Sequence, residues 1–165
     1  MPRERILLQR PDARHMTGRL EAIWIKRAHR GRMEPVSAAG VRAGFGLIGN
    51  ADESSTRQVS ILDQDGWEAA VRETGAAVDP IRRRANLLVR GVALAEARGR
   101  TLRIGACLFR IRGELRPCER MDEAQPGLRD ALKKHWRGGV FAQALSDGEI
   151  AVGDEVAWGD DPVDA

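Results

Sequence analysis

Short apolar stretches that alternate with polar residues and stop at glycines recur along this chain, and they constrain its fold more than any other feature. Residues 101–116 show the pattern most clearly, and we expect two strands or one long bent strand there. In its second half, Cys107, Phe109 and Ile111 occupy alternate positions. Side chains at alternate positions of a strand point to the same face, so these three residues are expected in a core.

The same reading predicts further strands at residues 20–27, 33–41, 58–62, 86–89, 140–142 and 150–158. The last two are expected to be joined by a turn at 146–148. Two short helices are predicted, one at 65–75 that ends at Gly75 and one at 126–136 with Pro126 near its first turn. Many short strands with a few brief helices are typical of a mainly β fold, and we predict a β-barrel with helical additions.

The length of 165 residues fits a single domain. We expect an Arg-rich lead-in at 1–17, the barrel domain at 18–158 and an acidic tail at 159–165. Hydrophobic residues make up 42% of the chain, which excludes a mostly disordered protein. No apolar run approaches the roughly 18 residues of a membrane span or forms the apolar core of a secretory signal, so we expect a cytoplasmic protein without a membrane partner.

The charge pattern argues weakly for an anionic ligand and against nucleic acid. The formal net charge is +3, and the basic residues gather toward the start of the chain. Aromatic residues are only 4% and tyrosine is absent, so a stacking surface for bases is hard to assemble. We therefore expect no nucleic-acid partner.

Three glycines, Gly44, Gly46 and Gly49, have the G-x-G-x-x-G spacing of a dinucleotide-binding loop. A strand is predicted after them where that motif requires a helix, so this interpretation is rejected. Glycines so close together still predict a backbone that turns tightly or closely approaches another group.

Cys118 is the most informative side chain for chemistry. It follows Pro117, and Arg112, Arg116 and Arg120 are close to it in sequence. Cationic neighbours favour a thiolate, which is both a nucleophile and a soft metal ligand. Taken alone, Cys118 could equally be a loop cysteine without a role, whereas Cys107 is expected to be a buried, inert core thiol.

A second candidate feature is the basic run at 82–84, followed closely by Asn86. Such a run is commonly a solvated charged segment. Alternatively, this whole cluster grips a phosphate, with Arg57 and backbone amides of the glycine loop converging on the same anion.

The motifs in their order resemble the MOSC domain, named from the C-terminal domain of molybdenum cofactor sulfurase, in its stand-alone bacterial form. The resemblance runs from about residue 18 to 158. The motifs that carry it are Gly-Leu-Ile-Gly-Asn-Ala-Asp (46–52), Arg-Gln-Val-Ser (57–60), Arg-Ala-Asn-Leu-Leu-Val-Arg-Gly-Val (84–92), Pro-Cys-Glu (117–119), Arg-Gly-Gly-Val-Phe-Ala (137–142) and Gly-Glu-Ile-Ala-Val-Gly-Asp-Glu-Val (148–156).

This resemblance implies a MOSC or pyruvate-kinase-barrel-like β-barrel that binds molybdenum cofactor, the molybdopterin form. It implies that Cys118, in the Pro-Cys position of the family, is the catalytic residue as a molybdenum ligand or persulfide carrier. Arg84 and Asn86 would contact the pterin or its phosphate, and Arg57 would be a further anion contact.

The glycine loop departs from the family pattern. The family commonly has Gly-Asp-x-His there, whereas this chain has Asn50 and Asp52 in place of the Asp and the His. Both positions remain candidate cofactor contacts. The departure puts in doubt any proton transfer or substrate contact assigned to the lost histidine.

Three functions follow from the resemblance and stay open at this point, so that enzymatic activity itself is undecided. One is reduction of small N-hydroxylated compounds at molybdenum, with electrons from a separate flavin or iron–sulfur partner. Another is sulfur transfer through a Cys118 persulfide loaded by a cysteine desulfurase. A third is a non-catalytic anion-binding barrel. Pyridoxal phosphate is not expected, because in this family it belongs to a separate desulfurase domain.

Overall fold

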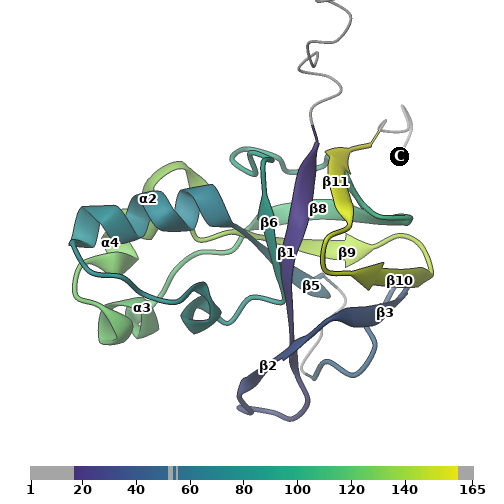
Figure 1. The fold of residues 1–165 in the computed structure, drawn as a ribbon, viewed down its shortest axis with the longest axis horizontal. Helices are drawn as coiled ribbons and strands as arrows, with labels where there is room; N and C mark the ends of the chain where they lie inside the picture. Colours follow the sequence, from purple (N-terminus) through teal and green to yellow (C-terminus); the bar gives the residue numbers. More distant parts are fainter. Residues whose placement is uncertain (1–16, 52–53, 55, 160–165) are drawn as a thin grey trace, which may run out of the picture.

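Seven strands close into a barrel in the part of the chain that the structure describes. The structure is a computed structural model, and it describes residues 17–51, 54 and 56–159. The barrel strands follow the order β11-β7-β8-β9-β5-β6-β1, β1 pairs again with β11, and β2 extends the sheet beyond β1 (Figure 1). The strands of this sheet are β1 (Gly18–Lys26), β2 (Met33–Val36), β5 (Val59–Asp63), β6 (Leu87–Arg90), β7 (Thr101–Ile104), β8 (Cys107–Glu114), β9 (Val140–Ala144) and β11 (Glu155–Trp158). The predicted mainly β barrel is confirmed.

The barrel interior follows the alternation seen in the sequence. Cys107, Phe109 and Ile111 on β8 are all fully buried, and they pack with side chains from the other barrel strands in one apolar cluster. Region 101–116 contains two strands, β7 and β8, which pair with each other in an antiparallel hairpin. Closing the sheet therefore places one face of each strand in a common core.

Strands β5 and β6 form a parallel pair, with Ile61 opposite Leu87. Parallel neighbours need a crossover, and helix α2 (Gln64–Thr74) begins it directly after β5. Because the two strands run in the same direction, both begin at the same edge of the barrel. Residues just before and at their starts, Ser60 and Asn86 among them, are therefore brought together.

A second, smaller sheet corrects two sequence predictions. Its order is β10-β3-β4, with β3 (Ala38–Arg42), β4 (Gly46–Leu47) and β10 (Gly148–Ala151). The predicted strand 150–158 is wrong as one unit: the backbone turns at Gly153, where φ is +97°, and β10 and β11 enter different sheets. The segment between β9 and β10 does not form a hairpin turn, because β10 pairs with β3 and β11 pairs with β1 and β7.

Region 33–41 was expected to be one strand beside 20–27. It divides at a bend at Ser37, so β2 pairs with β1 while β3 joins the small sheet. The division depends on which distant strands pair with each half, so the local sequence does not predict it.

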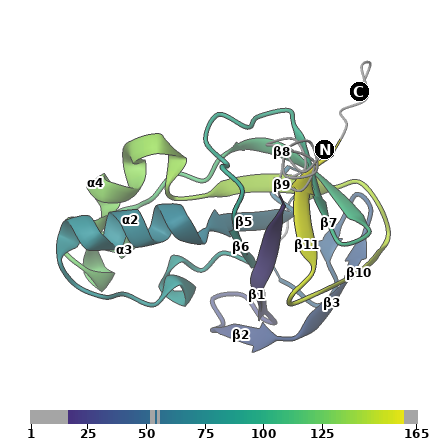
Figure 2. The same cartoon turned by 45° about the horizontal axis from the view of Figure 1, so that its top comes forward.

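The helices gather on one side of the barrel, as Figures 1 and 2 show. They are α2, α3 (Glu119–Ala124) and α4 (Leu128–Lys133), with 3-10 turns η2 (Pro80–Arg83) and η3 (Lys134–Trp136). A second apolar cluster, centred on the buried Trp67, joins them to the outer face of the barrel. The predicted helix 65–75 is confirmed, with Gly75 in the left-handed conformation at its end. The predicted helix 126–136 is shorter than expected: α4 begins at Leu128, after a left-handed Gly127, and ends at Lys133, and residues 134–136 form the 3-10 turn η3.

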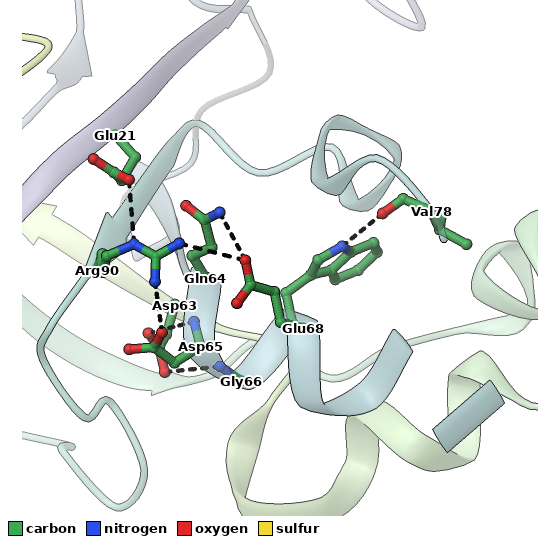
Figure 3. A network of polar contacts seen from close by, with 9 residues as sticks. Glu21, Asp63, Gln64, Asp65, Gly66, Glu68, Val78 and Arg90 are labelled. Atoms are coloured by element: carbon green, nitrogen blue, oxygen red, sulfur yellow. Dashed lines mark hydrogen bonds and ion pairs between the residues drawn. The ribbon is translucent and has the colours of Figure 1, made fainter. Parts of the chain in front are cut away.

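An arginine on β6 ties this helical side to the barrel. The Arg90 guanidinium donates to Glu21 on β1 and to Asp65 and Glu68 on α2, at 3.0–3.4 Å (Figure 3). These groups are well exposed, and exposed ion pairs contribute little individually. The network therefore orients α2 more than it stabilises the fold.

No helix among the described residues is long and apolar enough to cross a membrane. The predicted lead-in and acidic tail lie outside the described residues, apart from Thr17 and Gly159, and stay predictions.

Asp63 makes the stability of the fold depend on pH. It is the N-cap of α2, and its carboxylate accepts hydrogen bonds from the N–H groups of Asp65 and Gly66 at 3.2 Å. Burial raises the pKa of the Asp63 carboxyl from 3.8 to about 6, against the lowering effect of these two hydrogen bonds. A carboxyl with a higher pKa in the folded than in the unfolded chain stabilises the fold at low pH, and this contribution is lost as the pH rises through about 6.

We therefore expect Asp63→Asn, which cannot titrate, to gain stability relative to the wild type between about pH 4 and pH 6.5 and to show a constant difference above about pH 7. Urea unfolding at several pH values measures the difference in free energy of unfolding between the variant and the wild type. The test is how this difference changes with pH, because a change in the strength of the N-cap shifts it by the same amount at every pH. The exposed Asp130→Asn is the control. A difference between Asp63→Asn and wild type that is flat from pH 4 to pH 7 would contradict the raised pKa.

Candidate functional site

A pocket of about 170 Å³ lies at the barrel edge where β5 and β6 begin and β1 ends. It is built from the ends of strands and the loops that follow them, where a rigid barrel can position side chains precisely. Its lining residues are Lys26, Met33, Asn50, Ala51, Arg57, Gln58, Val59, Ser60, Arg84, Asn86, Leu115 and Phe141. We call it the cationic pocket.

The charge of this pocket is positive. Lys26, Arg57 and Arg84 line it, and none of its described lining residues is acidic. The Arg57 guanidinium lies 4.7 Å from the centroid of the Phe141 ring, in a cation–π contact. Arg84 donates to the carbonyl of Gly31 at 2.7 Å. Each arginine is thus held at one point and keeps further N–H donors for an anion.

Four of the five predicted cofactor contacts come together here, although they are distant in sequence. Arg57, Arg84, Asn86 and Asn50 all line the cationic pocket. Asp52 lies outside the described residues, so its predicted role stays a prediction. Arg84 has a left-handed backbone, with φ at 64°, because it is the C-cap of the 3-10 turn η2 and its N–H donates to the carbonyl of Ile81.

Asn86 is the structural centre of the pocket wall. It is 6% exposed. Its Oδ1 accepts from the backbone N–H and the hydroxyl of Ser60, both at 3.1 Å. Its Nδ2 donates to the Trp24 carbonyl at 3.2 Å and to Oδ1 of Asn50 at 3.1 Å. The same Asn50 oxygen accepts from the backbone N–H of Lys26 at 2.8 Å. These contacts connect three segments and make Asn86 a positioning residue.

The glycine loop closes this side of the pocket. At Gly46, where φ is +120°, a Cβ atom would lie 2.6 Å from the Gln58 carbonyl oxygen. Only glycine permits that approach. The expectation that the loop approaches another group closely is confirmed, and the group at Gly46 is the start of β5 rather than a ligand.

Cys118 lies between β8 and α3, where it is the N-cap of that helix and is partly buried. It is not among the lining residues of the cationic pocket. The three arginines near it in sequence, Arg112, Arg116 and Arg120, are all exposed.

The cation beside Cys118 is Arg83, which sequence reasoning did not single out from the basic run. Arg83 is 8% exposed, and it donates to the carbonyl oxygens of Gly138 (2.8 Å) and Leu115 (2.7 Å). Burial lowers the pKa of the Arg83 guanidinium, and the charge of Cys118 raises it. Since Leu115 lines the cationic pocket, Arg83 links the pocket to the thiol.

The glycine pair after η3 makes room for this link. A Cβ atom on Gly138 would lie 2.8 Å from the Leu115 carbonyl oxygen and 3.3 Å from an Arg83 nitrogen. On Gly139, where φ is +102°, it would lie 2.5 Å from the Ile61 carbonyl oxygen. The signal for a close approach was therefore present in the sequence as Gly138-Gly139, but not the identity of the group approached.

Cys107 contrasts with Cys118. Its side chain is fully buried in the barrel core, as predicted, and burial raises the pKa of the thiol. A buried neutral thiol is a poor nucleophile.

Comparison with known proteins agrees with the motifs and the fold. A family profile described as MOSC domain matches residues 27–157, whereas no curated protein matches the chain. The YuaD protein from Bacillus subtilis is 20% identical in sequence, with a TM-score of 0.72 over 86% of this chain and 94% of that one. YiiM from Escherichia coli is 14% identical, with a TM-score of 0.64 over 86% of this chain and 70% of that one. YiiM from Geobacillus stearothermophilus is also 14% identical, with a TM-score of 0.66 over 88% and 77%.

These solved structures share the barrel, and the profile covers most of the described domain. With its motifs in order and its fold in agreement, the chain belongs to the MOSC domain family.

Proposed function

We propose that this protein binds molybdenum cofactor, with the phosphate in the cationic pocket and the metal at Cys118, and reduces small N-hydroxylated compounds with electrons from a separate flavin or iron–sulfur partner. One observation carries the proposal. Two arginines and a lysine line a pocket that a single buried arginine connects to the cysteine of the Pro-Cys motif.

The pocket suits a phosphate in its chemistry. Arginine forms paired hydrogen bonds to phosphate oxygens, and lysine adds a compact charge. Arg57 is oriented by the Phe141 ring and Arg84 by the Gly31 carbonyl, so less conformational freedom is lost when an anion binds. The hydrogen-bonded Asn86 and Asn50 keep the pocket wall in place.

Cys118 suits a soft metal as its thiolate. The Arg83 guanidinium lies close enough to Cys118 for the two groups to interact electrostatically. When bound, the cofactor would supply the two-electron redox chemistry that removes an oxygen atom from the substrate and releases water. The residues of this chain would hold the anion, present the thiolate and shape the approach to it.

A sulfur carrier is the second candidate. Its support is that Cys118 is partly buried beside a cation and is not a lining residue of the cationic pocket. A persulfide loaded there by a cysteine desulfurase would need only access and charge stabilisation.

Molybdenum and phosphorus content of protein purified from a cofactor-competent host tests the proposal. We expect about one molybdenum per chain, with phosphorus in proportion, and loss of most of both in the Arg57→Gln/Arg84→Gln variant, because two charge-assisted anchors are removed. The matched control is Arg103→Gln/Arg112→Gln, which removes two exposed arginines outside the pocket. Equal content in both double variants would overturn the assignment of the pocket, and wild-type protein without molybdenum would overturn the reductase.

A further inference from the structure

A second pocket is lined in part by Pro117, the residue that precedes Cys118. It has a volume of about 340 Å³ and is lined by Glu114, Arg116, Pro117, Arg129 and Lys133. It shares no lining residue with the cationic pocket. Its walls are the end of β8 and one face of α4, so it is bordered by regular structure on two sides.

Arg129 is the unusual member of this pocket. Its Nε atom is buried and has no hydrogen-bond partner among the described residues. Its backbone N–H donates to the Asp122 carboxylate at 3.0 Å, so the unpaired donor is the side-chain Nε. Buried donors in native proteins are almost always paired, and a missing acceptor at a concave site points to a ligand.

The charges around Arg129 indicate the sign of that ligand. Arg116 and Lys133 add two cations against the single carboxylate of Glu114. The ion pairs that these two cations make are long: Arg116 lies 3.9 Å from Glu114, and Lys133 lies 3.4 Å from Asp130. Arg116, Lys133 and Asp130 are mostly exposed, and exposed ion pairs are weak. An entering oxyanion would therefore meet a net positive pocket.

We propose that this pocket binds the carboxylate or phosphate group of a small molecule, with Nε and a terminal nitrogen of Arg129 as a paired donor and with Lys133 and Arg116 as added charge. Planar paired donors are the geometry that arginine offers to oxyanions. Because Pro117 forms one wall, the bound molecule would lie next to the segment that carries Cys118. It follows that the molecules acted on at Cys118 bear an anionic group, and this last step alone rests on the proposed function.

The binding test uses inorganic phosphate and succinate as probes, titrated by calorimetry and by amide shifts in NMR spectra. It is carried out in the Arg57→Gln/Arg84→Gln background, so that the cationic pocket does not contribute. We expect one of the probes to bind, with shifts at the amides of residues 114–117 and 129–133, and the tighter one identifies the anion class. Adding Arg129→Gln should weaken binding by about tenfold or more, as expected when a charged, paired donor is lost.

Arg110→Gln is the matched control, because Arg110 on β8 has the same unpaired, buried Nε but does not line this pocket. It should leave binding unchanged. Thermal unfolding gives a second measurement: without anion, Arg129→Gln should be at least as stable as its parent, and saturating probe should raise the midpoint of the parent only. No binding of either probe, or equal binding with and without Arg129→Gln, would overturn the site. The Arg129→Gln variant of the otherwise wild-type chain should contain normal molybdenum. Probe binding therefore tests this pocket and molybdenum content tests the cofactor proposal, so that either can fail without the other.

Discussion

Cys118→Ser should lose molybdenum, or persulfide where that is the cargo, to below about a tenth of the wild-type content while its free energy of unfolding changes by less than about 1 kcal/mol. A serine hydroxyl replaces neither a thiolate ligand nor a sulfur carrier at neutral pH. The fold should tolerate the change, because Cys118 is partly exposed and its side chain makes no capping hydrogen bond to α3.

Cys107→Ser is the reciprocal control. Its loading should stay normal, because the thiol is enclosed in the barrel core, while the buried hydroxyl should lower stability by about 1–3 kcal/mol. Elemental analysis measures the molybdenum content of these samples, and urea unfolding measures their stability. Persulfide is measured by labelling after treatment with a cysteine desulfurase and cysteine. Equal loading in the two variants would remove Cys118 from the mechanism.

The same samples separate the two candidate functions. Molybdenum near one per chain that is lost only in Cys118→Ser supports the reductase, and electron-donor assays follow. Persulfide on Cys118 without molybdenum supports the carrier. If neither cargo is found in the wild type, the non-catalytic anion-binding barrel is the function that remains.

Asn86→Ala should lower the free energy of unfolding by about 3 kcal/mol, the largest stability effect that we expect from one side chain at the site. It leaves the buried N–H of Ser60 and the carbonyl of Trp24 without their side-chain partner, and it releases Asn50. Each buried polar group left unpaired costs about 1–3 kcal/mol. Urea unfolding followed by tryptophan fluorescence measures the change.

Ser60→Ala is the matched comparison, because it removes one hydroxyl from the same network and keeps the backbone contacts. We expect a loss of about 1 kcal/mol, and less than additive losses in the double variant because the two residues are in direct contact. Phosphorus content should also fall in Asn86→Ala, since the pocket wall moves. An Asn86→Ala variant as stable as the wild type would show that the network is not a structural centre.

Local patterns predicted those parts of the fold that depend on local physics. The alternation through Cys107, Phe109 and Ile111 marked a strand with one buried face, and Gly75 marked the end of α2. The division of 150–158 into β10 and β11 escaped prediction because it depends on pairing with β3, β1 and β7, which are far away in sequence. A strand pattern records which face is buried but not which neighbour covers it.

The candidate site divides in the same way. Residue types and spacing singled out Cys118, Arg57, Arg84 and Asn86, and the resemblance to the family added Asn50; the last four of these share one pocket. The role of Arg83 could not be found from sequence, because the three arginines of 82–84 look equivalent until η2 directs one of them inward against Gly138 and Leu115. Likewise, Asn86 was predicted to contact the cofactor, and only the folded chain shows its hydrogen bonds to Ser60, Trp24 and Asn50.

By itself, the sequence determined the class of fold, the family and the residues worth testing, because alternation, turn glycines and ordered motifs are properties of a one-dimensional chain. Tertiary structure alone decided which of these residues meet. It joined the starts of β5 and β6 into one cationic pocket and brought the buried Arg83 beside Cys118. It also left the Nε of Arg129, which lines a pocket with Pro117, without a partner among the described residues. The physical reason is that charge and hydrogen bonding act over a few ångströms in space, and closing a barrel sets those distances without regard to separation along the chain.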